Sequence, residues 1–183
     1  MVPPDAGPVL CGIARGALEQ VLRGADVARP SGAWLDEPGA AFVTLTRGGA
    51  LRGCIGTLQA FRPLRTDVAD NAVAAATRDP RFPPLPPAHL DSTAIEVSVL
   101  SPPVDLEVTS EADALRRLRP HVDGVILTYD RHRGTFLPQV WEQLPEPARF
   151  LAHLKRKAGL AADWWDPGVR LQRYTVTAYH EGS

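Results

Sequence analysis

The feature that most constrains this chain is the run Leu51-Arg52-Gly53-Cys54-Ile55-Gly56-Thr57, in which a cationic side chain and a thiol stand two positions apart. Side chains at i and i+2 of a strand point to the same face, so an extended run places Arg52 beside Cys54. A guanidinium beside a thiol favours the thiolate, which is the nucleophilic form. Gly53 and Gly56 allow another backbone, or a ligand, to approach closely. The alternative is that Cys54 is a small buried residue and the glycines serve a hairpin or a bulge.

Charge and cysteine content restrict the class of protein. Among 183 residues, 20 Lys and Arg balance 21 Asp and Glu, which argues against a protein dominated by binding to nucleic acid or to an anionic membrane. No stretch approaches the roughly 18 apolar residues of a membrane span, and the N-terminus does not resemble a signal peptide. The two cysteines, Cys11 and Cys54, form neither a disulfide framework nor a metal-ligand spacing. We therefore expect a cytoplasmic protein without a metal or cofactor of its own.

The hydrophobic pattern mixes helices with hairpin-forming strands. Two β runs, 41–46 and 51–58, flank the turn Arg47-Gly48-Gly49 and predict an antiparallel hairpin. Further strands are expected over 94–100, 124–129, 135–137 and 171–179, with 130–134 as a turn that includes His132. Helices are expected over 9–24, from Pro63 to about Asp79, after a cap at Thr109 or Ser110, and over 147–159. Because no βαβ repeat is present, this order predicts an α+β fold with a mainly antiparallel sheet flanked by helices.

Two further polar positions are candidates for a binding site. Glu96 lies on the polar face of the predicted strand 94–100, where it could pair with Arg52 or hold a substrate amine. Its alternative is a solvated strand face or a structural ion pair. Arg81, in Arg78-Asp79-Pro80-Arg81-Phe82, could grip an anionic or planar ligand, or belong to a helix end whose Phe82 plugs the core.

These pieces, in this order, resemble the AMMECR domain family, also called AmmeMemoRadiSam system protein A. The resemblance covers about residues 9–181. It rests on the LRGCIG run together with Asp79-Pro80-Arg81-Phe82-Pro83-Pro84-Leu85, Ile95-Glu96-Val97-Ser98-Val99-Leu100, Leu137-Pro138-Gln139-Val140-Trp141 and Lys157-Ala158-Gly159-Leu160. Many relatives carry a second cysteine where this chain has Lys155, so Cys54 would have to act alone here.

The resemblance implies one AMMECR-type domain over residues 1–183, with a larger lobe that holds both termini, a smaller inserted lobe and a cleft between them. It also implies partners, a Memo-like protein and a radical SAM protein. The first functional hypothesis is accordingly an accessory binding protein that recognises its partner through Arg52, Arg81, Gln139 and nearby backbone. The alternative is an enzyme or modification factor that uses Cys54 as a nucleophile, with Glu96 or Arg81 orienting a small substrate. A third, structural interpretation gives the LRGCIG run no role beyond closing a hairpin.

Overall fold

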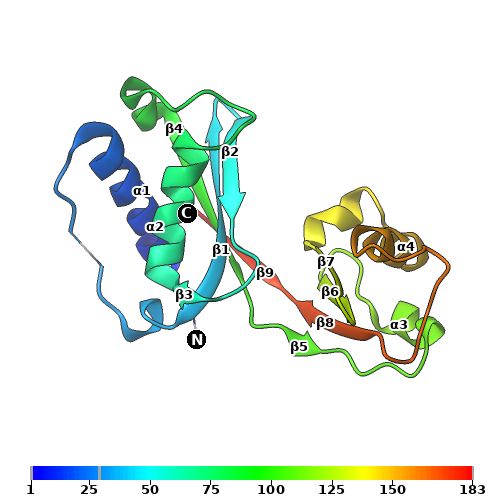
Figure 1. Cartoon of the computed structure of the whole chain (residues 1–183). Helices are drawn as coiled ribbons and strands as arrows, with labels where there is room; N and C mark the ends of the chain where they lie inside the picture. The colour runs from blue at the N-terminus through cyan, green and yellow to red at the C-terminus, as the bar shows by residue number, and fades with distance from the viewer. Residues whose placement is uncertain (1, 29, 183) are drawn as a thin grey trace. The chain divides into compact units, whose positions relative to one another are not determined.

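The computed structural model describes residues 2–28 and 30–182, and the chain divides into two compact units (Figure 1). Unit 1 extends to Leu100 and resumes at Thr177, and unit 2 comprises Ser101–Val176. The chain therefore leaves unit 1 once, builds unit 2, and returns for its last strand. Helices and antiparallel strands are present in both units, so the predicted α+β class is confirmed.

Unit 1 is built on a five-stranded sheet in the order β2-β1-β4-β9, with a short β3 also paired to β1. Its strands are β1 (Pro38–Arg47), β2 (Ala50–Gly56), β3 (Arg62–Pro63), β4 (Thr93–Leu100) and β9 (Val176–His180). The predicted hairpin is β1 and β2. Its turn requires glycine, because Gly48 and Gly49 adopt φ of 57° and 79°.

Two helices, α1 (Gly7–Arg23) and α2 (Leu64–Thr77), cover one face of this sheet (Figure 1). Alternation along β1 decides which side chains face them: Ala41, Val43 and Leu45 are fully buried, whereas Phe42 and Thr44 between them are half-buried. The helices end close to the predicted positions, since Gly24 closes α1 with φ 69° and α2 stops shortly before Pro80. In the described residues of unit 1, no α-helix covers the second face of the sheet.

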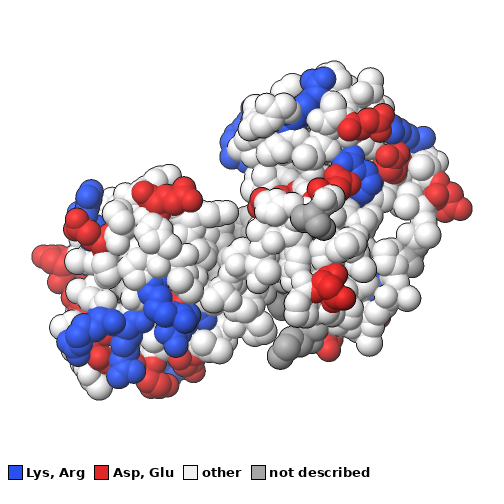
Figure 2. Space-filling view, turned by 180° about the vertical axis from the view of Figure 1, so that it is seen from behind, with Lys and Arg blue, Asp and Glu red and all other residues white. Residues whose placement is uncertain are grey.

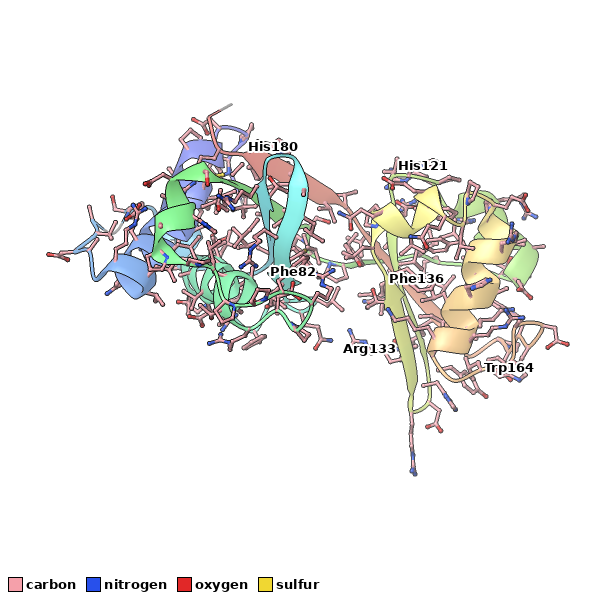
Figure 3. All side chains as sticks on the ribbon, turned by 90° about the horizontal axis from the view of Figure 1, so that it is seen from above. Phe82, His121, Arg133, Phe136, Trp164 and His180 are labelled. Atoms are coloured by element: carbon pink, nitrogen blue, oxygen red, sulfur yellow. The ribbon has the colours of Figure 1, made fainter. Side chains whose placement is uncertain are left out.

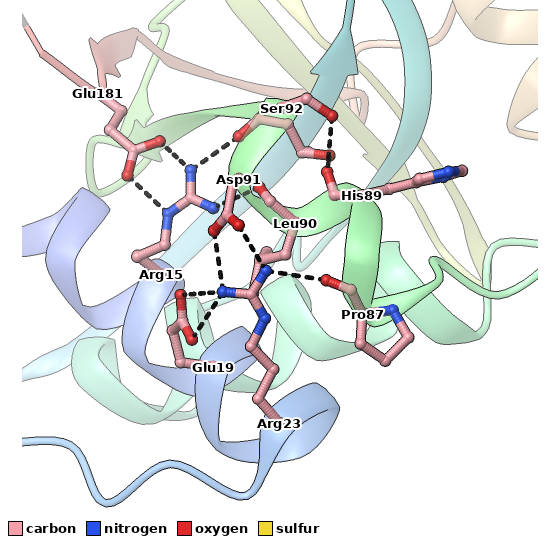
Figure 4. Close-up of polar contacts among 10 residues, drawn as sticks. Arg15, Glu19, Arg23, Pro87, His89, Leu90, Asp91, Ser92 and Glu181 are labelled. Atoms are coloured by element: carbon pink, nitrogen blue, oxygen red, sulfur yellow. Dashed lines mark hydrogen bonds and ion pairs between the residues drawn. The ribbon is translucent and has the colours of Figure 1, made fainter.

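A charged network fastens the C-terminal segment and the 3-10 turn η2 (Pro87–Ser92) to α1 (Figure 4). The Arg15 guanidinium donates to both carboxylate oxygens of Glu181 and to the Leu90 carbonyl at 2.9 Å. About two turns further along α1, Arg23 donates to Asp91 at 2.8 and 2.9 Å, and this contact holds the pKa of Asp91 below its usual range. The two arginines thus hold segments that lie far apart in the sequence against the same helix.

Unit 2 contains a four-stranded antiparallel sheet in the order β5-β8-β6-β7. Its elements are β5 (Val104–Asp105), α3 (Glu111–Arg117), β6 (Gly124–Tyr129), β7 (His132–Phe136), the 3-10 turn η3 (Pro138–Glu142), α4 (Pro147–Lys157) and β8 (Arg170–Tyr174). The core of this unit centres on Trp141, whose ring stacks on Phe150 at 3.7 Å and whose indole N–H donates to the Asp123 carbonyl at 2.7 Å. Ser110 caps α3, as one of the two predicted candidates, by accepting from the Asp113 amide.

The structure corrects two predictions in this region. The predicted strand 171–179 is two strands, because Thr175 exchanges hydrogen bonds with Ser101 and the chain passes there from the sheet of unit 2 to that of unit 1. The predicted turn 130–134 is also too long. His132 already belongs to β7, where its Nδ1 lies 2.9 Å from the Ala158 carbonyl oxygen.

Charges of both signs are mixed on the surface of unit 2. Figure 2, in which this unit is on the left, has basic and acidic side chains beside one another. Ion pairs in this unit include Arg117 with Asp113 on α3 at 3.0 Å and Arg119 with Asp123 in the turn after α3 at 2.6 Å. In the part of the chain that the structure describes, no helix has both the length and the apolar character needed to cross a membrane.

Candidate functional site

Cys54 belongs to a row of polar side chains that crosses three strands of unit 1. Thr44 on β1 is in register with Cys54 on β2 and with Glu96 on β4, so all three side chains lie on the sheet face opposite α1 and α2. The Thr44 hydroxyl donates to Cys54 Sγ at 3.4 Å. The sulfur therefore lies at one end of this row, where its neighbour in the row is Thr44, and it is half-buried.

The other end of this row is a carboxylate paired with an imidazole. Glu96 Oε1 accepts from the Ser98 hydroxyl at 3.0 Å, and Oε2 lies 3.4 Å from Nδ1 of His180 on β9 (Figure 3 labels His180). The expected position of Glu96 on the polar face of its strand is confirmed, and its side chain contacts Ser98 and His180. The sequence does not reveal His180 as a partner of Glu96, because the two residues are more than eighty positions apart. Thr44, in contrast, follows from the predicted hairpin register.

The loop after α2 caps the peptide groups of Cys54 on the outer edge of β2. The Asp79 carboxylate accepts from the Cys54 amide at 2.9 Å, and Arg81 Nη2 donates to the Cys54 carbonyl at 3.2 Å. Arg81 also binds Asp79 through Nε at 3.0 Å and Nη2 at 2.7 Å. The Arg81 guanidinium, followed by the Cys54 amide, holds the pKa of Asp79 far below its usual range. This cap satisfies the edge strand and fixes the Arg81 side chain, which is still 53% exposed.

Arg52 does not lie where a regular strand would place it. The β1–β2 register shifts between Leu45 and Thr46, which leaves Arg52 as the extra residue of a β-bulge. Its Nη2 donates to the Pro83 carbonyl at 2.6 Å, and its guanidinium lies 5.7 Å from the ring centre of Phe82 (Figure 3). The guanidinium that contacts Cys54 is therefore that of Arg81, which lies 5.5 Å from the same ring.

The two glycines of the run are explained by packing. A Cβ on Gly53 would lie 2.1 Å from the Ala75 carbonyl oxygen of α2, and one on Gly56 would lie 2.2 Å from Cγ of Phe42. The backbone that approaches Gly53 is thus that of α2, in agreement with one of the two expected uses of glycine. Gln139 is exposed on η3 in unit 2.

The two cysteines have different environments. Cys11 is buried in the core of unit 1, as predicted, and burial raises the pKa of its thiol to about 11. Cys54 is the more accessible of the two, and its sulfur accepts from a side-chain hydroxyl, whereas the Cys11 thiol donates to the Tyr179 carbonyl at 3.6 Å. Within residues 2–28 and 30–182, no three His, Cys, Asp or Glu side chains gather as a metal site.

Comparison with known proteins identifies relatives over almost the whole chain. A protein of Methanothermobacter thermautotrophicus is 42% identical over 182 residues, covering 97% of this chain and 95% of the relative. A Thermotoga maritima protein is 43% identical over 141 residues, covering 76% of each chain. The crystal structure of the uncharacterized protein PH0010 from Pyrococcus horikoshii superimposes with a TM-score of 0.79 at 32% identity, covering 99% of this chain and 94% of that one. The AMMECR1 family model matches residues 11–179, and the chain belongs to the AMMECR1 family.

Proposed function

We propose that this protein is an accessory binding component of an AmmeMemoRadiSam-type system and acts with a Memo-like protein and a radical SAM protein. The classes of partner come from the family resemblance. The recognition surface comes from the geometry around β2 and the loop after α2. Both the capped edge strand and the arginines belong to unit 1, so this surface needs no contribution from Gln139.

The observation that carries the proposal is the fixed but exposed guanidinium of Arg81. Asp79 and the Cys54 carbonyl hold its Nε and Nη2, while 53% of the side chain is exposed. A guanidinium held in this way has lost most of its conformational freedom before it meets a partner, so binding costs less entropy. Phe82, which lies beside both arginines, adds apolar area to the same surface. Arginine and aromatic side chains are enriched in the residues that dominate protein interfaces.

The test is to measure the affinity of this chain for the Memo-like and radical SAM proteins encoded in the same genome. We expect Arg81→Gln and Arg52→Glu each to weaken association by about tenfold or more. The matched control is Arg78→Glu, because Arg78 is exposed and lies next to Asp79. Thermal melting of each variant separates lost binding from lost folding. Unchanged affinity in both folded variants rejects this recognition surface.

A second candidate function, thiol-dependent chemistry on a small substrate, is favoured by the hydrogen bond from Thr44 to Cys54 Sγ. In this hypothesis Cys54 is the nucleophile, and the Glu96–His180 pair accepts a proton further along the same sheet face. The side chain that hydrogen-bonds the sulfur is a hydroxyl and not a base, which places this candidate second.

Alkylation kinetics of Cys54 discriminate between the two candidates. In a Cys11→Ala background, the binding proposal predicts that iodoacetamide modifies native Cys54 more slowly than the same residue in urea-unfolded protein. Thiol chemistry requires that Cys54 be alkylated faster in the native protein than in the unfolded protein. It also requires that this excess rate be lost in Thr44→Val, which keeps the side-chain shape and removes the hydroxyl. A fast native reaction that depends on Thr44 would therefore place the enzyme hypothesis first.

A further inference from the structure

We propose that the loop 58–61 is a docking element that inserts the Phe61 ring into an apolar pocket of a protein partner. This inference rests on the accessory role proposed above and names a second contact surface for it. The loop joins β2 to β3 in unit 1 (Figure 1). Of the large apolar side chains in the described residues, Phe61 is the most exposed at 70%, and Leu58 in the same loop is 39% exposed. An aromatic ring presented in this way resembles the anchors that supply most of the binding energy at interfaces.

The loop is fastened at both ends to one buried carboxylate. Asp67 on α2 is fully buried, and its Oδ1 accepts from the Thr57 hydroxyl at 2.7 Å and from Arg62 Nε at 2.8 Å. Its Oδ2 is held in turn by the Ala41 amide at 2.8 Å and the Asn71 amide group at 3.1 Å. The residues directly before and after the loop are therefore fixed on the same side chain. A loop that is ordered before binding loses less entropy when a partner engages it.

The charge around Phe61 favours a protein pocket over a membrane or a nucleic acid. The Arg62 guanidinium lies 5.2 Å from the ring centre of Phe61, and it is neutralised by Asp67 at 2.8 Å and by Asp70 at 2.6 Å. No surplus positive charge therefore accompanies the ring, whereas anionic lipid and phosphate backbones are bound through such a surplus. An apolar ring beside a neutralised ion pair matches a pocket that is itself apolar.

A second copy of this chain is a poorer occupant. A cavity of about 310 Å³ lies between α1 and α2 in unit 1, and its lining includes the polar side chains of Gln20, Thr66 and Asp70. An aromatic ring placed there would remove these groups from water without offering them a hydrogen bond. This cavity is therefore a poor receptor for the Phe61 ring of a second copy, and we assign the receiving pocket to a different protein.

The experiment measures the affinity of the full chain for the Memo-like and radical SAM proteins by titration calorimetry, together with sedimentation of the chain alone. We expect Phe61→Ser to weaken binding by at least about tenfold and Phe61→Tyr to restore most of it. Val21→Ser is the matched control, because Val21 is 54% exposed on α1 and lies outside the loop. The control should bind like the wild type.

Each result separates this inference from the accessory role. Wild-type affinity in Phe61→Ser, with binding lost in the arginine variants, overturns the docking loop and leaves the accessory role intact. An equal loss in the Val21→Ser control overturns the assignment to this loop. Self-association of the chain that disappears in Phe61→Ser identifies a second copy as the occupant and overturns the choice of a different protein. A wild-type chain that binds neither protein overturns both proposals.

Discussion

Replacement of Gly53 by alanine is expected to lower the free energy of unfolding of unit 1 by about 3 kcal/mol, the upper end of the usual cost of overpacking. The new Cβ would lie 2.1 Å from the Ala75 carbonyl oxygen and 2.9 Å from the carbonyl carbon. Both are backbone atoms in the last turns of α2, so no side-chain rotation can relieve the contact. Either β2 or α2 has to move; β2 carries Cys54, and α2 leads directly into the loop that holds Asp79 and Arg81.

Gly12→Ala provides a control of opposite sign. Gly12 lies inside α1, and a Cβ built there meets nothing within 4 Å. Alanine at such a helix position is expected to raise stability by about 0.5–1 kcal/mol. Native-state hydrogen exchange of the amides in β2 and α2 measures the stability of unit 1 in both variants. A Gly53→Ala protein whose β2 and α2 amides exchange as slowly as in the wild type would disprove the close helix–strand contact.

Local sequence could predict the parts of the fold that have a regular pattern, but not those that depend on contacts between distant residues. The hairpin, the alternating strand 94–100 and both helices of unit 1 were predicted because their patterns repeat every two or every three to four residues. The division of the strand 171–179 at Thr175 was not predicted, because the alternation of side chains along the sequence continues across this residue. What separates β8 from β9 is the pairing of Thr175 with Ser101, a contact between residues 74 positions apart.

Local sequence indicates which residues are candidates for a site more readily than it indicates which atoms they contact. Arg52, Cys54 and Arg81 all lie near one another at the edge of β2, but the expected partner of Cys54 was Arg52. Strict alternation fails at the bulge, and a bulge leaves no clear mark in one sequence. Asp79 caps Cys54 from 25 positions away, which local periodicity cannot reveal. Lys155, noted only as a replacement for a cysteine, has a structural role that burial alone discloses.

Lys155 is fully buried in unit 2, and its ammonium group donates two hydrogen bonds. Nζ donates to Glu111 Oε1 at 2.6 Å and to the Trp164 carbonyl at 3.0 Å. The Glu111 side chain is 33% exposed, whereas that of Lys155 is 0% exposed. The pair is therefore asymmetric, because Glu111 retains access to water when its partner is removed and Lys155 does not.

Glu111→Ala is expected to lower the free energy of unfolding of unit 2 by about 3–5 kcal/mol, because it leaves a buried ammonium without its counter-charge. Lys155→Met should change that free energy by less than about 1 kcal/mol, since the thioether fills the same volume and the freed carboxylate can be hydrated. Hydrogen exchange of the amides in α3 and α4 measures the free energy of unfolding of unit 2 in both variants. Glu142→Ala, an exposed acid on η3, is the control for removing a negative charge.

The double variant Glu111→Ala/Lys155→Met isolates the cause. If the cost of Glu111→Ala arises from the stranded ammonium, adding Lys155→Met removes the charge and restores stability to about that of Lys155→Met alone. The cost could arise instead from the loss of a favourable carboxylate at the start of α3. In that case the destabilisation by Glu111→Ala is only about 0.3–1 kcal/mol and persists in the double variant. Equal destabilisation by Glu111→Ala in both backgrounds would show that the ion pair contributes nothing, and that Lys155 is held by the Trp164 carbonyl and packing alone.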